Sequence, residues 1–320
     1  MGFLQDYEIC YGLLWVYRIP LTVHESQQNY KHHCFFSGSM RRHPDWLKVR
    51  IGSGENYSKV KNLLRSAKLH TICEEAKCPN IAECFGGGTA VFLILGNICT
   101  RSCRYCNVTH GNPSSINVHE PHDIAESVHT LGLKYVVVTS VTRDDLPDGG
   151  AGVFYETVQE IRRFNKECKI EVLIPDFQAN EGALQKIIDA APDVINHNIE
   201  VVKELFSLIR PQGDYQRSLD VLQAIKKKTK KIPTKSGLMV GLGETKEQIR
   251  STFEDLRTAQ VDFLTIGQYL QPTQMHTQII KYYSPDEFQE LKTIAQNLGF
   301  THVESGPLVR SSYHAANAFL

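Results

Sequence analysis

Six of the chain's nine cysteines lie within one stretch of 34 residues. They form two triplets: Cys73, Cys78 and Cys84, followed by Cys99, Cys103 and Cys106. Disulfide frameworks are typical of small secreted domains that cannot build a sufficient core. A chain of 320 residues can bury a core without them, and cysteines spaced this closely favour metal binding. We therefore expect reduced, metal-binding thiols in a reducing compartment, the cytoplasm.

The second triplet has the spacing Cys-x3-Cys-x2-Cys, so one short loop supplies three thiolates. A [4Fe-4S] cluster has four irons, and three cysteines leave one of them without a protein ligand. A zinc site is the alternative, but structural zinc takes four ligands, usually from two distant Cys-x2-Cys pairs. The spacing therefore predicts an iron–sulfur cluster with one iron open to a substrate.

The first triplet ends at Cys84, fifteen residues before the second one begins. Next to a cluster motif it predicts a second, auxiliary cluster. Again three thiolates are present, so the fourth ligand must be another side chain, water or substrate. Of the remaining cysteines, Cys168 precedes an expected strand and is predicted to be a small buried hydrophobic residue, whereas Cys10 and Cys34 lie near the N-terminus.

From about residue 88 to residue 305, short β-rich runs alternate with helical segments. The expected strands are 90–95, 135–140, 170–174, 194–198, 236–240 and 263–269. The expected helices are 121–131, 153–165, 181–190, 216–228, 246–259 and 285–298, two of which open with helix-start signals at Thr245 and Ser284. Such alternation indicates parallel strands with right-handed crossovers. No Gly-x-Gly-x-x-Gly follows a strand, which disfavours a dinucleotide-binding fold.

The predicted fold is α/β: a partial (β/α)6 TIM-like barrel with N-terminal and C-terminal extensions that carry the auxiliary cluster. We divide the chain into a disordered or non-native extension (1–39), a segment with the auxiliary-cluster cysteines (40–88), the barrel (89–305) and a C-terminal Arg-Ser-Ser-Tyr segment (306–320). Residues 1–39 lack helical or strand periodicity, and Met40 opens a segment that resembles a protein start, so we expect Met40 to be the native start.

Composition narrows the possible partners. The formal net charge is zero, which gives no sign of a nucleic-acid or anionic-membrane partner. The basic run 226–231 is expected to be a solvated helix end rather than a binding patch. No segment approaches the roughly 18 apolar residues of a transmembrane helix. The apolar run 9–16 is short and follows acidic residues, which argues against a secretory signal.

The position of the second triplet points to its chemistry. Cys99 comes just after the first expected strand, at the end where barrel folds assemble their active sites. With the aromatic Tyr105 before the third cysteine, this loop resembles the radical S-adenosylmethionine superfamily. The resemblance implies that the methionyl amine and carboxylate bind the open iron and that the aromatic residue lies near the adenine. An electron from the cluster would then cleave the sulfonium to a 5′-deoxyadenosyl radical.

Further segments resemble the lipoyl synthase family over nearly all of residues 40–320. The matching blocks are 78–84, 139–150, 196–200, 235–245, 267–272 and 306–313, in the family's order. The resemblance implies an octanoyl substrate, bound as an amide to a lysine of a small carrier domain. That carrier would be the E2 subunit of a 2-oxoacid dehydrogenase or the H protein of the glycine cleavage system. Radicals would remove hydrogen at C6 and C8, and the auxiliary cluster would be consumed as the sulfur donor.

The same resemblance supplies candidates for the remaining site residues. The fourth ligand of the auxiliary cluster would be Ser311 or Ser312 of the Arg-Ser-Ser-Tyr motif. An electron donor such as ferredoxin or flavodoxin would reduce the radical cluster. Asn198, Glu200 and Arg210 follow an expected strand and are candidates for contacts to the methionyl or ribose groups, although structural roles are equally compatible with their positions.

Other readings of the pattern remain. Arg143 and Lys235 would hold cofactor or carrier groups, or form ordinary salt bridges. The chain could be another radical enzyme that inserts sulfur or modifies peptides. Two features favour the lipoyl synthase family over this alternative: the first triplet lies before the radical motif, and the Arg-Ser-Ser-Tyr motif ends the matching blocks. A two-cluster electron carrier is a further alternative; such carriers are usually small and bring four cysteines to each cluster.

Overall fold

The computed structural model describes residues 44–49, 54–87, 90–313 and 315–316. The predicted extension 1–39, the expected start at Met40, and the cysteines Cys10 and Cys34 lie outside these residues. The part that is described begins with a short 3-10 helix, η1 (Asp45–Leu47).

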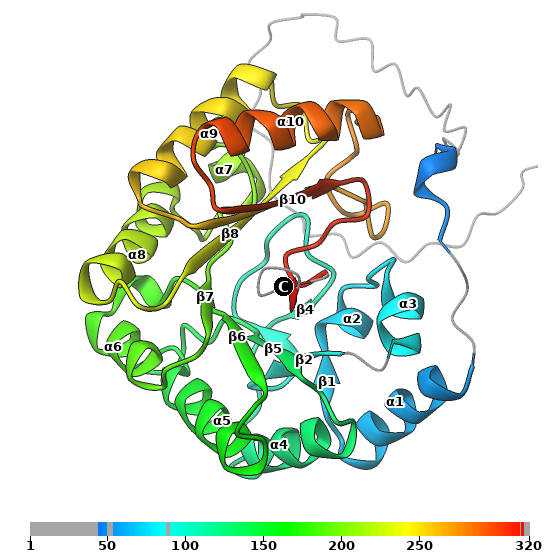
Figure 1. The fold of residues 1–320 in the computed structure, drawn as a ribbon, viewed down its shortest axis with the longest axis vertical. Coiled ribbons are helices and arrows are strands. Elements are labelled where there is room, and N and C mark those ends of the chain that lie inside the picture. Colours follow the sequence, from blue (N-terminus) through cyan, green and yellow to red (C-terminus); the bar gives the residue numbers. More distant parts are fainter. Residues whose placement is uncertain (1–43, 50–53, 88–89, 314, 317–320) are drawn as a thin grey trace, which may run out of the picture. The chain divides into compact units, whose positions relative to one another are not determined.

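An eight-stranded curved sheet forms the inner layer of the fold (Figure 1). Its strand order is β1-β2-β5-β6-β7-β8-β9-β10, with β1 antiparallel to β2 and the other pairs parallel. The strands are β1 (His70–Thr71), β2 (Val91–Ile94), β5 (Tyr135–Ser140), β6 (Lys169–Leu173), β7 (Val194–Asn196), β8 (Thr234–Val240), β9 (Phe263–Gln268) and β10 (His302–Gly306). Two short strands, β3 (Ile98–Cys99) and β4 (Thr109–His110), pair beside the sheet. The predicted partial parallel barrel is confirmed.

Helices cover the outer face of this sheet (Figure 1). They are α4 (Glu120–Thr130), α5 (Ala151–Phe164), α6 (Glu181–Asp189), α7 (Lys203–Ile209), α8 (Tyr215–Lys228), α9 (Lys246–Thr258) and α10 (Pro285–Asn297), with the 3-10 turn η2 (Phe177–Ala179) before α6. Thr245 and Ser284 cap α9 and α10 with complete capping boxes, as the sequence signals predicted. All six expected helices are present, and α7 is an addition.

Three helices precede the first parallel strand: α1 (Glu55–Ser66), α2 (Ile72–Glu75) and α3 (Ile81–Gly86). Val60 and Leu64 give α1 a buried stripe, and α1 packs against α3. Thr71 caps α2, because its hydroxyl oxygen accepts a hydrogen bond from the N–H of Glu74. These helices join the edge of the barrel through β1, so the first cysteine triplet sits beside the first strands (Figure 1).

The differences from the expected elements have local causes. Strand β10 was not predicted because it carries His, Glu, Ser and Gly, and Val303 is its one buried residue. Strand β7 is two residues shorter than expected. Beyond Asn196, the His197 ring turns inward and its Nδ1–H donates to the carbonyl of Ile174 at 2.9 Å. The backbone nevertheless stays bonded to β8, because the N–H groups of His197 and Glu200 donate to the carbonyls of Lys235 and Gly237, at 3.0 and 2.9 Å.

The apolar core has two parts. One is built by β2, β5, β6 and the helices α4, α5 and α6, and includes Cys168, which is 2% exposed as predicted. The other is built by β8, β9 and the helices α9 and α10. The basic run at the end of α8 is not wholly solvated, because Lys226 is buried and pairs with Asp262 at 2.9 Å.

A buried ion pair lies inside the barrel. Lys235 of β8 donates from Nζ to both carboxylate oxygens of Glu171 of β6, at 3.1 and 3.0 Å. Asn196 and Tyr135 donate to the same carboxylate, at 2.9 and 2.7 Å. Of the two roles considered for Lys235, the structure shows the salt bridge.

We expect Lys235→Met to lower the free energy of unfolding by about 3 kcal/mol or more, because it leaves Glu171 charged and buried without its cation. Lys169→Met is the matched control. Lys169 pairs with Asp193 but its side chain is 51% exposed, so its loss should change the free energy by less than about 1 kcal/mol. Urea denaturation measures both. Equal effects of the two substitutions would contradict a structural role for the buried pair.

Candidate functional site

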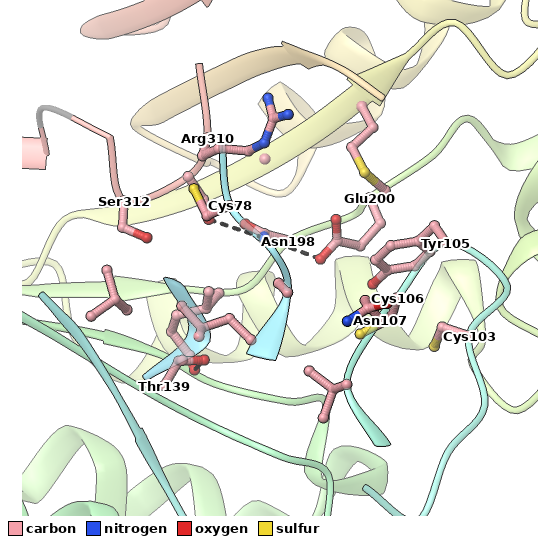
Figure 2. Close-up of a pocket in the computed structure, with 18 of the residues that line it drawn as sticks. Cys78, Cys103, Tyr105, Cys106, Asn107, Thr139, Asn198, Glu200, Arg310 and Ser312 are labelled. Atoms are coloured by element: carbon pink, nitrogen blue, oxygen red, sulfur yellow. Dashed lines mark hydrogen bonds between the residues drawn. The ribbon is translucent and has the colours of Figure 1, made fainter. Parts of the chain in front are cut away.

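One cavity of about 480 Å³ lies where the carboxyl ends of the parallel strands meet. The last residues of β5, β6 and β9, Ser140, Leu173 and Gln268, form part of its wall. It is also lined by all the residues predicted as cluster ligands or as contacts of S-adenosylmethionine: Cys73, Cys78, Cys84, Cys99, Cys103, Tyr105, Cys106, Asn198, Glu200, Arg210, Ser311 and Ser312. Figure 2 shows part of this set converging from distant segments. The structure brings the candidates together, and their individual roles remain proposals.

The loop of the second triplet, here called the radical loop (Cys99–Cys106), is held against the end of β5. The N–H and hydroxyl of Thr100 both donate to the carbonyl of Thr142, each at 3.0 Å. The Sγ of Cys99 accepts hydrogen bonds from the N–H groups of Arg101 and Thr142, at 3.4 and 3.3 Å. Backbone donors therefore already point at the sulfur that would bind iron.

A buried guanidinium fixes the middle of the radical loop. Arg101 donates from Nε and Nη2 to Asp144 at 2.6 and 2.8 Å, and from Nη1 and Nη2 to Asp176 at 3.0 and 2.7 Å. Arg217 of α8 donates to the same Asp176 at 2.9 Å. Burial opposes the charge of Asp176, but the hydrogen bonds from Arg101 outweigh it and hold the pKa of that carboxyl well below its usual range. This network ties the loop to segments after β5 and β6 and to α8.

The first triplet lies on short helices beside the radical loop. Cys73 is on α2 and Cys84 is on α3. Asn107, directly after Cys106, donates from Nδ2 to the carbonyl of Glu75 at the end of α2, at 2.7 Å. This hydrogen bond joins the segments that carry the two cysteine triplets.

Four of the six thiols are at least partly buried, in surroundings that disfavour a free thiolate. Burial, reinforced by neighbouring thiolates, raises the pKa of Cys73 and of Cys106 to about 12 each. Burial also raises the pKa of Cys78 and Cys103. A buried thiolate needs a strong positive partner, and iron ligation supplies one by displacing the proton. The site therefore fits cluster irons at both triplets.

The C-terminal segment is fastened to the region between Cys78 and Cys84. Asn80 donates from Nδ2 to the carbonyl of Leu308 at 2.7 Å. The hydroxyl of Tyr313 donates to the carboxylate of Glu83, 3.0 Å from each oxygen. These contacts lie on either side of the two serines, so they hold the serine pair over the first triplet.

Close backbone packing places the same segment on β9. A Cβ atom at Gly267 would lie 2.1 Å from the carbonyl oxygen of Val309, so only glycine allows this approach. The Oγ of Ser311 then accepts a hydrogen bond from Asn198 Nδ2 at 3.3 Å. In Figure 2, Ser312 and Cys78 lie on one side of the cavity and Cys103 on the other. Ser312 therefore lies on the side of Cys78 in this view, whereas Ser311 is bonded to Asn198.

Polar side chains gather on the radical-loop side. Asn198 donates from Nδ2 to Glu200 Oε1 at 3.1 Å, and Arg210 donates to the carbonyl of Asn198 at 3.3 Å. Burial raises the pKa of Glu200 although Arg210 opposes the shift, and Tyr105 bonds to the same carboxylate. The Oδ1 of Asn198 and the Nε of Arg210 are buried without a hydrogen-bond partner among the described residues. These atoms fit the amino-acid and ribose groups of S-adenosylmethionine, which offer donors and acceptors.

Two further polar groups line the cavity that were not singled out from the sequence. The Oγ of Ser140 and the Nε2 of His197 are buried without a partner among the described residues. Burial lowers the pKa of His197 to about 4, so its ring is neutral near pH 7. Since Nδ1 carries the proton donated to Ile174, Nε2 is an acceptor facing the cavity. His197 belongs to the matching block 196–200, and this was the sequence signal that could have marked it as a cavity residue.

Of the weaker candidates, the backbone region 139–142 lines the cavity. Arg143 does not; it forms a salt bridge with Asp145 at 2.8 Å, and its Nη1 donates to the carbonyl of Leu95 at 3.4 Å. Residues 268–272, from the matching block 267–272, all lie at the cavity wall.

The fold is shared with proteins of known structure. The chain superposes on methylornithine synthase with a TM-score of 0.50, 14% identity and 82% coverage of each chain. It superposes on SuiB of Streptococcus suis bound to S-adenosylmethionine with a TM-score of 0.53 and 12% identity, covering 81% of this chain and 58% of that one. The model of the radical SAM superfamily matches residues 93–256. Fold and site thus define a radical S-adenosylmethionine protein.

A model described as the N-terminal domain of lipoyl synthase matches residues 21–78. The lipoyl synthases of Shouchella clausii and Halalkalibacterium halodurans are 57% and 54% identical, over 86% of this chain and 89% and 91% of theirs. That of Caldicellulosiruptor bescii is 51% identical, over 87% of this chain and 96% of its own. The chain belongs to the lipoyl synthase family. As such it uses S-adenosylmethionine and two [4Fe-4S] clusters.

We expect Arg101→Lys to reduce iron bound at the radical loop, because an ammonium cannot bridge two carboxylates as a guanidinium does. The measurement is iron content and the change in the cluster's EPR spectrum on adding S-adenosylmethionine, in protein whose first triplet is replaced by alanine. Arg217→Lys is the matched control, because it touches the same Asp176 from a partly exposed position. Full loading and an unaltered spectrum in Arg101→Lys would contradict a positioning role.

We expect Tyr313→Phe to speed iron loss from the first triplet several-fold, since it frees the C-terminal segment from α3. The assay follows iron release to a chelator in protein whose radical-loop cysteines are replaced by alanine. Tyr155→Phe removes an equivalent hydroxyl at an exposed site on α5 and serves as control. Identical release rates for both variants would show that the contact with Glu83 does not hold the segment.

Proposed function

We propose that the chain forms lipoyl groups by inserting two sulfur atoms, at C6 and C8, into an octanoyl chain bound to a lysine of a lipoyl carrier domain. The carrier is the E2 subunit of a 2-oxoacid dehydrogenase or a glycine cleavage H protein. The observation that supports this most directly is the shared cavity, which two cysteine triplets and the Arg-Ser-Ser-Tyr serines line together. A radical generator and a sulfur source are thereby available to one substrate.

The residues divide the work between them. When bound, the clusters and S-adenosylmethionine supply a carbon radical that removes hydrogen from the substrate and the sulfur that replaces it. Cys99, Cys103 and Cys106 hold the radical cluster, and Cys73, Cys78 and Cys84 hold the auxiliary one. Tyr105, Asn198, Glu200 and Arg210 bind S-adenosylmethionine on the radical-loop side.

Apolar side chains of the cavity suit an alkyl substrate. They include Leu93, Val141, Leu173, Leu238 and Met239. An octanoyl methylene offers no polar group to recognise and no acidic proton, so general acid–base chemistry has nothing to act on. The contribution of these walls is to hold C6 and C8 in reach of the radical and of the sulfur source and to exclude water.

A serine completes the auxiliary site. Oxygen is a hard ligand and binds a soft iron–sulfur site weakly, so the iron held by Ser311 or Ser312 is the one that leaves most easily. Contacts with Asn80 and Glu83 keep both serines near the first triplet. Ser311 is also bonded to Asn198, which links the serine pair to the S-adenosylmethionine side.

The remaining proposals concern location and electron supply. Closely spaced cysteine triplets that favour metal binding over disulfides support a reducing compartment, the cytoplasm. Among the described residues, no helix is long and apolar enough to cross a membrane. A small redox protein such as ferredoxin or flavodoxin supplies the electrons that S-adenosylmethionine cleavage consumes.

The test is anaerobic incubation of reconstituted protein with dithionite, S-adenosylmethionine and an octanoyl-lysyl peptide, followed by mass spectrometry. We expect two hydrogens to be replaced by two sulfurs. Ser311→Ala or Ser312→Ala, whichever removes the iron ligand, should still yield 5′-deoxyadenosine while losing sulfur insertion at least about tenfold, and the other serves as its control. No sulfur gain in the unmodified protein would refute the function, and full insertion by both variants would refute the serine ligand.

A further inference from the structure

The proposed function requires one electron for each S-adenosylmethionine cleaved. The C5′–S bond breaks, the sulfur keeps one bond electron together with the incoming one and leaves as methionine, and the carbon keeps the other as a radical. The donor is oxidised by one electron each time. Since electron transfer through protein slows steeply with distance, the donor must dock where the radical loop comes closest to the surface.

The radical loop reaches the surface on one side. Ser102 and Arg104, which flank Cys103, are both exposed. Arg104 lies between two neighbouring segments: its N–H donates to the carbonyl of Ile209 at 2.9 Å, and its carbonyl accepts from the N–H of Thr277 at 3.0 Å. The end of α7 and the loop after β9 therefore border the exposed part of the radical loop.

The loop after β9 also contacts the cluster-binding backbone directly. The ring of His276 donates from Nε2–H to the carbonyl of Cys106 at 3.0 Å, and its Nδ1 accepts from the hydroxyl of Thr273 at 2.8 Å. Both ring nitrogens are thus used, and the loop is fixed on the radical loop. Arg104 directly follows Cys103, and His276 is bonded to the backbone of Cys106. A partner that binds this border would therefore lie close to two of the proposed iron ligands.

Exposed apolar side chains stand on both bordering segments. Leu208 of α7 is 51% exposed and Met275 of the loop is 92% exposed, and Ile280 farther along that loop is 60% exposed. These are three of the seven large hydrophobic residues that are exposed in the described chain. Leu208 precedes Ile209, and Met275 lies two residues before Thr277, so both are carried by the segments bonded to Arg104. Methionine suits a surface that adapts to a transient partner, and exposed apolar side chains beside a functional loop suit an interaction site.

Charge at this border is mixed but carries two unpaired cations. The side chains of Arg104 and of Lys203, at the start of α7, are exposed and form no ion pair among the described residues. The adjacent Glu204 is the exposed acid of α7, and Lys281 pairs with Glu287. A partner with carboxylates around an apolar centre would complement this arrangement.

We propose that the surface formed by Arg104, Lys203, Leu208 and Met275, the donor face, docks a small acidic redox protein that carries a flavin or an iron–sulfur cluster. The inference rests on the proposed function and names the partner that reduces its radical loop. Redox encounters use small interfaces, so two apolar contacts and two cations are sufficient. The carrier domain that brings the octanoyl chain is the rival occupant.

The test compares two electron sources on the same reconstituted protein. 5′-Deoxyadenosine formation is measured with reduced flavodoxin, with reduced ferredoxin, and with dithionite, for Met275→Glu, Leu208→Glu and the control Val118→Glu. Val118 is 79% exposed and does not line the cavity. We expect the KM for the protein donor to rise at least roughly tenfold in the first two variants, with the dithionite rate and the KM for the octanoyl carrier unchanged. Lys203→Glu should lower the donor's rate most at low salt.

Each other outcome overturns the donor face. Unchanged donor KM in both variants, a matching loss with dithionite, a raised KM for the carrier, or no turnover of the unmodified protein with either redox protein would do so. Met275→Ser removes apolar surface without adding charge. If Met275→Glu binds less iron, the KM of Met275→Ser for the protein donor is used in its place. Failure of the proposed function itself is separate, because it would appear as no sulfurated product with dithionite.

Discussion

The buried fork of Arg101 is the contact on which the site depends. One guanidinium joins Asp144, after β5, to Asp176, after β6, and Arg217 of α8 closes the group. A charged network out of water is stable only when every partner is present and hydrogen-bonded. The radical loop contains three thiols that gain their natural partner only with iron, so it needs this independent anchor. The barrel thereby presents the loop in one conformation.

The auxiliary half of the site is organised differently. In the described part of the chain, the contacts that hold it include a close backbone approach and side-chain hydrogen bonds to a distant segment. The carbonyl of Val309 packs closely against Gly267. Asn80 donates a hydrogen bond to the carbonyl of Leu308, and Glu83 accepts one from the hydroxyl of Tyr313. Contacts of this kind are weaker and more exposed than a buried ion cluster. The proposed role of the auxiliary cluster, as a sulfur source that is consumed, suits the looser of the two settings.

The sequence predicted those parts of the structure that short-range patterns encode. Apolar runs predicted six of the seven parallel strands of the eight-stranded sheet, capping residues predicted the starts of α9 and α10, and cysteine spacing predicted both cluster sites. It missed β10, whose polar residues pair in the sheet without apolar alternation, and α7, which follows the apolar run from β7 without a boundary signal. It left Lys235 undecided because Glu171, its partner, lies on another strand. The contacts of Asn80 and Glu83 join residues 228 and 230 positions apart, a separation that no local pattern reports.

That separation has a consequence for how the protein is made. Synthesis runs from the N-terminus, so the cysteines of the first triplet emerge long before Ser311 and Ser312. The serines can reach these cysteines only after β9 has formed, because the segment that carries them packs against Gly267 of β9. Contacts of such long range form late in folding. During translation the first triplet therefore lacks the proposed serine ligand, and the barrel must fold before that serine can reach it.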